Sequence, residues 1–148
     1  LPPGTGDIQL TLSQKIPVTG SVVVTTPQDI ALIDARKAVD MFRKVNIPIF
    51  GVLENMSVHI CSQCGHSEAI FGSGGGQNLA ETLKVPLLGQ LPLALPVREA
   101  MDTGSALALQ RNHPQIAEIY QQAALSVALA VADKGKDFSG RFPKIVIE

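Results

Sequence analysis

The hydrophobic pattern alternates between short apolar runs and longer stretches with helical spacing. Three apolar runs predict strands, over residues 21–26, 48–53 and 85–91. The first is so continuously β-branched that we expect it to be buried on both faces of a sheet. Loops are expected after each run, over residues 27–29, 54–71 and 92–96.

Between the strands, apolar positions recur at the three- and four-residue intervals of amphipathic helices. The pattern predicts helices over residues 7–16, 30–45, 72–84, 97–103 and 114–132. Pro114 fits the first turn of the last helix, where its missing N–H costs no hydrogen bond. Residues 133–148 read as a mobile tail, in which residues 144–147 are long enough to add an edge strand.

Strands that alternate with helices predict an α/β fold with a parallel sheet and flanking helices. In such sheets, ligands bind at the carboxyl ends of the strands. We therefore expect the loops from Pro27, Glu54 and Pro92 to lie together at one edge. A fourth loop, over residues 1–7, is expected to follow a strand upstream of Leu1, so we interpret the chain as a fragment of a longer protein.

The bulk composition is that of one globular domain, here assigned to residues 1–132. The 148 residues are 45% hydrophobic and 17% charged, with a net charge of −1. A chain without a basic field is not expected to bind nucleic acid by counterion release. The longest apolar run, over residues 123–132, is too short to span a bilayer, so no membrane partner is expected.

The richest concentration of metal-ligating side chains is the stretch from His59 to His66, which holds both cysteines, Cys61 and Cys64. A lone C-x-x-C pair does not resemble a secreted disulfide framework, so a reducing cytoplasm is the expected location.

Three interpretations of the cysteine pair compete. A zinc site could take His59 and His66 as further ligands, although four ligands within eight residues would be cramped.

The second interpretation is a dithiol/disulfide couple, but Gly65 and more loop stand where a redox motif would have a helix. In the third, two copies of the chain supply four thiolates to one iron–sulfur cluster or zinc ion. Two inert buried cysteines are disfavoured, because their neighbours are polar. The spacing leaves these alternatives open.

Other candidate residues carry weaker signals. The Gly-rich loop before Asp7 is suited to a phosphate or a metal-bound water, and equally to a tight turn. The run Gly74–Gly76 at a helix start could bind an anion through free N–H groups. Asn55 could contact a base or cap a turn. No G-x-x-x-x-G-K-[ST] pattern occurs in the sequence, so motifs alone do not predict ATP binding.

Three segments together resemble the Mrp/ApbC family of iron–sulfur cluster carriers, which are MinD-like, deviant P-loop NTPases. They are the residues Pro-Pro-Gly-Thr-Gly-Asp at 2–7, Val-Thr-Thr-Pro-Gln-Asp-Ile-Ala-Leu at 24–32, and Glu-Asn-Met-Ser at 54–57 leading to Cys-Ser-Gln-Cys-Gly at 61–65 and Phe-Gly at 71–72. The resemblance covers residues 1 to about 111. It implies a partial P-loop NTPase fold that lacks its N-terminal strands.

The resemblance also implies a function and its residues. Cys61 and Cys64 of each subunit of a homodimer would hold a labile [4Fe-4S] cluster, with zinc as a possible substitute, for transfer to recipient apoproteins. The loop with Thr5 and Asp7 would be the switch loop. Asn55 would contact adenine, and the loop at Pro92 and Leu93 would close over the base. Slow ATP hydrolysis would be coupled to the transfer.

The sequence departs from the family in lacking the P-loop, its signature lysine and the Walker B aspartate. Without a phosphate cradle, phosphoryl transfer loses its main electrostatic stabilisation, so we expect no ATP hydrolysis by this chain without an N-terminal part that supplies ATP and Mg²⁺ binding. Exposed sheet edges would favour a swapped or intertwined dimer. The alternatives are a zinc-binding dimeric module and a MinD-like positioning ATPase.

Overall fold

The computed structural model describes residue 11 and residues 15–133 of the chain. Its elements are β1 (Ser21–Thr25), α2 (Asp29–Lys44), β2 (Ile49–Ile60), β3 (Ser67–Glu68), α3 (Gly75–Leu83), β4 (Leu87–Ala94), α4 (Leu95–Asp102), α5 (Ala106–Asn112) and α6 (Pro114–Asp133). The expected α/β fold is therefore confirmed. Thr5 and Asp7, most of the helix predicted over residues 7–16, and the tail from residue 134 lie outside the described residues.

The sheet is organised around β2, the longest strand. β1 and β4 both pair with β2 in parallel, as the alternation of strands and helices predicts. The predicted parallel pairing therefore holds for β1, β2 and β4, and the short β3 adds an antiparallel pair to β2, so the sheet is mixed. His59 pairs with Leu93 of β4 and with Glu68 of β3, so these two strands flank the end of β2.

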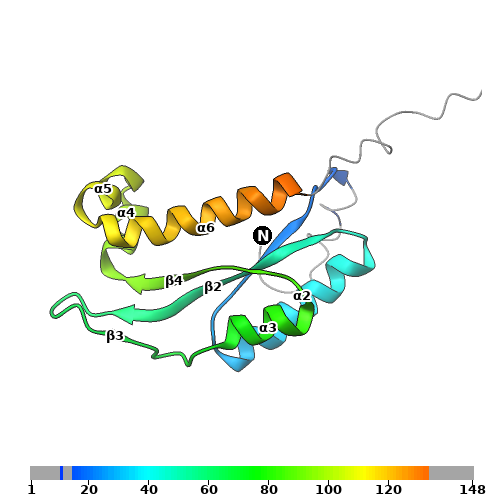
Figure 1. Cartoon of the computed structure of the whole chain (residues 1–148), viewed down its shortest axis with the longest axis horizontal. Coiled ribbons are helices and arrows are strands. Elements are labelled where there is room, and N and C mark those ends of the chain that lie inside the picture. The colour runs from blue at the N-terminus through cyan, green and yellow to red at the C-terminus, as the bar shows by residue number, and fades with distance from the viewer. Residues whose placement is uncertain (1–10, 12–14, 134–148) are drawn as a thin grey trace, which may run out of the picture.

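Helices cover both faces of the sheet. Figure 1 shows α2 and α3 on one side and α6 on the other. Leu79 of α3, Val39 of α2 and Val52 of β2 are almost fully buried in one apolar cluster between the helices and the sheet. A second, smaller cluster joins α4, α5 and α6 through Ala100, Leu109 and Ala117.

The face of β1 toward α6 is less covered than the sequence predicted. Val24 is 57% exposed, whereas Val23 and Thr25 on the alternate positions are buried. The reason is that α6 packs on β4 and β2, and β1 has one strand partner within the described residues. The expectation that β1 is buried on both faces was therefore wrong.

Among the described residues, no helix combines the length and apolarity that crossing a membrane requires.

The largest differences from the predicted element boundaries lie at the carboxyl ends of β2 and β4. β2 does not stop at residue 53 but continues to Ile60, through a bulge where Met56 has a φ of 57°. β4 continues through Pro92 and Leu93 to Ala94, and α4 begins at once, so the predicted loop at residues 92–96 was wrong. The longer strands follow from their pairing, since residues of β2 up to Ile60 match β4 up to Ala94.

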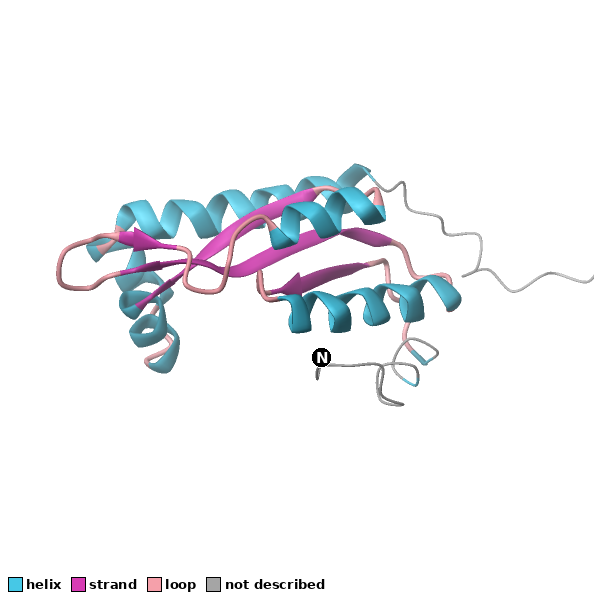
Figure 2. Cartoon of the chain, turned by 90° about the horizontal axis from the view of Figure 1, so that it is seen from below, coloured by secondary structure: helices cyan, strands magenta, loops and turns pink. Residues whose placement is uncertain are grey.

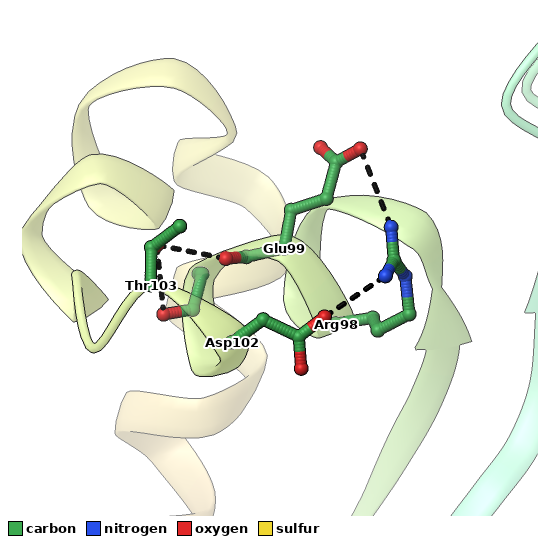
Figure 3. Close-up of polar contacts among 5 residues, drawn as sticks. Arg98, Glu99, Asp102 and Thr103 are labelled. Atoms are coloured by element: carbon green, nitrogen blue, oxygen red, sulfur yellow. Dashed lines mark hydrogen bonds and ion pairs between the residues drawn. The ribbon is translucent and has the colours of Figure 1, made fainter.

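The short helix α5 was not predicted, whereas the end of α4 was. Figure 3 shows how α4 ends: the Thr103 hydroxyl donates to the Glu99 carbonyl at 2.8 Å, while Arg98 pairs with Asp102 at 2.8 Å. Gly104 follows with a φ of 64°, a conformation that glycine adopts without strain. The Arg98 ion pair is solvent-exposed, so its net contribution to stability is small.

Candidate metal centre

Both cysteines lie at the tip of a β-hairpin formed by β2 and β3. The Cys61 N–H donates to the His66 carbonyl and the Gly65 N–H donates to the Cys61 carbonyl, each at 2.9 Å. Gly65 has a φ of 73°, which a residue with a side chain rarely adopts. The turn is therefore closed by backbone bonds, and the C-x-x-C spacing places both thiols on it.

The hairpin tip is open to solvent. The Cys64 side chain is exposed and that of Cys61 is half-buried, and both cysteines are free thiols. The side chains from Ser62 to Ile70 are all exposed. Figure 2 shows the tip extending as a loop beyond the helices, at the same end of the molecule as the α4–α5 pair. The disfavoured interpretation of two buried, inert cysteines therefore does not apply.

The turn itself favours a thiolate at Cys61. The pKa of Cys61 is lowered because its sulfur accepts hydrogen bonds from the backbone N–H groups of Gln63 and Cys64, and then from the Cys64 thiol. Hydrogen bonds to the charged form stabilise that form. Since the thiolate rather than the thiol binds metals, the lowered pKa of Cys61 favours the form that a metal site would need.

One described chain supplies only part of a ligand set. Among the described residues, no group of three or more His, Cys, Asp or Glu side chains is placed to hold a metal ion. His59 lies in β2 and His66 closes the turn with its carbonyl, and the fold does not gather them with the cysteines into a four-ligand zinc site. Within the described residues, the hairpin therefore presents two free thiols, fewer than the four ligands of a closed metal site.

The residues expected at a nucleotide base lie on neighbouring strands. Asn55 of β2 pairs with Leu91 of β4, immediately before Pro92 and Leu93. Asn55 is inside β2 rather than at its end, and its side-chain oxygen accepts a hydrogen bond from the Met56 N–H at 3.0 Å. The structure thus brings the three residues together, but in strands and not in the predicted closing loop.

A buried carboxylate that the sequence analysis did not single out lies next to Asn55. The Glu54 side chain is 1% exposed and accepts hydrogen bonds from the Gly76 N–H at 2.5 Å and from the Gln90 side-chain amide at 2.7 Å. Gly76 is in the first turn of α3, and its N–H was one of the groups expected to bind an anion. In the structure this N–H donates to the Glu54 carboxylate instead. The signal available in the sequence was a carboxylate directly after the apolar run of residues 48–53.

The known proteins that this chain resembles are named for the transfer of iron or of iron–sulfur clusters. The family described as "ParA: NUBPL iron-transfer P-loop NTPase" matches residues 1–128. An iron-sulfur cluster carrier protein of Pseudomonas fragi is 61% identical over 126 residues, which cover 85% of this chain and 44% of the relative. The iron-sulfur cluster transfer protein NUBPL of Mus musculus is 49% identical over 86% of this chain and 40% of the relative. The chain thus spans less than half the length of these curated relatives.

Two solved structures share the fold. A nucleotide-binding protein of Archaeoglobus fulgidus, in complex with ADP and with cobalt found in it, superposes with a TM-score of 0.56 at 26% identity, over 98% of this chain and 49% of that one. The cell division ATPase MinD of Pyrococcus furiosus superposes with a TM-score of 0.53 at 18% identity, over 75% of this chain and 43% of that one. The second likeness concerns the fold alone.

Proposed function

Because the chain belongs to the ParA family of NUBPL iron-transfer P-loop NTPases, we propose that it carries the cluster-binding residues of an iron–sulfur cluster carrier. The observation that carries this proposal is the hairpin tip, where Cys61 and Cys64 lie on one closed, exposed turn. The names of the relatives from Pseudomonas fragi and Mus musculus support the same role. The cluster is cargo that the protein receives and hands on.

The incomplete ligand set supports a site shared by two copies. A [4Fe-4S] cluster is commonly held by four cysteine thiolates, and one chain has two cysteines. We propose that Cys61 and Cys64 of two copies bridge one cluster. The exposed position of the tip allows a second copy to approach, and it also leaves the cluster accessible to a recipient apoprotein.

The proposed function includes nucleotide binding. We propose that Asn55, Pro92 and Leu93 form the base-binding part of an ATP site, and that Thr5 and Asp7 belong to its switch loop. The bound ADP of the Archaeoglobus fulgidus relative and the pairing of Asn55 with Leu91, the residue before Pro92, support the base-binding part. Phosphate binding and hydrolysis would need residues beyond those described for this chain.

Anaerobic reconstitution tests the proposed cargo. After incubation with ferrous iron and sulfide, we expect the chain to show the broad visible absorption of an iron–sulfur cluster and to bind iron and sulfide in equal amounts. Metal analysis supplies the second readout. A colourless protein that binds zinc in preference to iron would contradict the proposal and favour the zinc-binding module.

A further inference from the structure

The hairpin that carries the cysteines has two limbs with unequal support. The outgoing limb is β2, which pairs with β4 as far as Ile60 and Ala94. The return limb, residues 67–76, pairs with β2 at Ser67 and Glu68, continues through mostly exposed residues and ends in the first turn of α3, where Gly75 and Gly76 are buried. Along residues 67–73, the side chains are exposed apart from the half-buried Phe71.

The carboxylate of Glu54 meets the return limb where it re-enters the body of the protein. Its hydrogen bond with the Gly76 N–H joins two residues 22 positions apart and closes the chain segment that contains the cysteine turn. Its second oxygen accepts a hydrogen bond from Gln90, which ties the same point to β4. Glu54 therefore connects the limb to two strands at once.

The packing around this point leaves little room for adjustment. A Cβ at Gly76 would lie 2.8 Å from the Glu54 carboxylate oxygen, and one at Gly75 would lie 2.6 Å from the Pro27 carbonyl oxygen. The first turn of α3 is thus pressed against β2 and the connection after β1. A carboxylate buried to this degree is costly unless both of its oxygens accept hydrogen bonds. Here the donors are two neutral groups, the Gly76 N–H at the N-terminus of α3 and the Gln90 side-chain amide on β4.

We propose that Glu54 is a positioning residue for the metal centre: it anchors the return limb of the hairpin and so fixes the orientation of the Cys61–Cys64 turn. The inference rests on the proposed function, since the turn is useful only if it binds a cluster. Glu54 touches neither cysteine. Its effect on the cluster passes through the backbone of the limb.

Two substitutions in the full chain distinguish the effect of the Glu54 hydrogen bonds from the effect of the Glu54 charge. Glu54→Gln can keep both bonds, because its oxygen accepts from Gly76 and its amide donates to Gln90 once the Gln90 amide turns over. Glu54→Leu removes both acceptors and leaves the buried Gly76 N–H without a partner. Val39→Ala in the core of α2 serves as a control for general loss of stability.

Amide hydrogen exchange of the cluster-free chain gives the first readout. In Glu54→Leu we expect residues 69–76 to exchange about tenfold faster or more, whereas Glu54→Gln matches the parent chain. Release of the cluster to a chelator gives the second readout, and we expect it to be at least about tenfold faster in Glu54→Leu alone. If Glu54→Leu does not fold, Gly76→Ala displaces the carboxylate instead and is expected to act in the same direction.

Several results would overturn the inference. They are parent-like exchange and release in Glu54→Leu, a Glu54→Gln variant as defective as Glu54→Leu, or an equal acceleration of limb exchange and release in Val39→Ala. If the parent chain takes up no cluster, the proposed function fails, while exchange of residues 69–76 still decides whether Glu54 anchors the limb.

Discussion

Replacing Cys61 or Cys64 by serine is expected to abolish cluster binding. A serine hydroxyl is a hard, protonated group and does not substitute for a soft thiolate ligand of iron. In a site shared by two copies, either substitution removes two of the four thiolates at once. The loss of cluster affinity should therefore exceed the roughly 10–100-fold loss of metal affinity that follows when a ligand loses its hydrogen-bonding partner. Visible absorption after anaerobic reconstitution measures it.

Ser62→Ala is the matched control for the cysteine variants. Ser62 lies in the same exposed turn between the two cysteines. The bonds that close the turn and lower the pKa of Cys61 come from other residues, so we expect normal cluster binding in this variant. Full cluster binding by both cysteine variants would refute the assignment of Cys61 and Cys64 as ligands.

Replacing Leu79 by alanine is expected to lower the free energy of unfolding by about 3 kcal/mol, within the range of buried Leu→Ala substitutions. Leu79 is 1% exposed and lies in the apolar cluster between α3, α2 and the sheet. The alanine would leave a cavity under β2, because close-packed neighbours collapse only in part. A loss of this size is a large fraction of the stability of a typical domain.

Urea denaturation of the parent chain and the variant measures this loss. Leu107→Ala is the matched control, because the Leu107 side chain on α5 is 66% exposed and should change the free energy of unfolding by no more than about 0.5 kcal/mol. Equal effects of the two substitutions would contradict the described core.

The sequence pattern predicted the parts of the fold that local signals determine. The helical spacing over residues 30–45 corresponds to α2, and Pro114 opens α6 as expected. The helix α5 was missed because its seven residues are too few to reveal a period and Ser105 forms no side-chain cap. Short helices of this kind are stabilised by packing, here through Leu109.

The errors in strand length have a different cause. The pattern over residues 54–60 contains Glu54, Asn55 and His59, which argue against a strand, yet β2 continues because β4 pairs with it. The bulge at Met56 changes the alternation of faces, so no simple period remains to be read. Tertiary pairing overrides local propensity at this point.

The candidate site was predictable only where its chemistry is local. Cys61 and Cys64 form a motif within four residues, and the turn that holds them is also local. Glu54 acts through Gly76 and Gln90, which lie 22 and 36 positions away, and no spacing in the sequence reveals such a contact. The assignment of Asn55, Pro92 and Leu93 to a nucleotide stays a prediction.

The most direct test of a cluster shared by two copies is the mass of the reconstituted chain under native conditions. We predict a species of two chains with one [4Fe-4S] cluster, which is lost together with the visible absorption in the Cys61→Ser and Cys64→Ser variants. A single chain that holds a complete cluster, or a dimer that carries one cluster on each chain, would contradict the shared site.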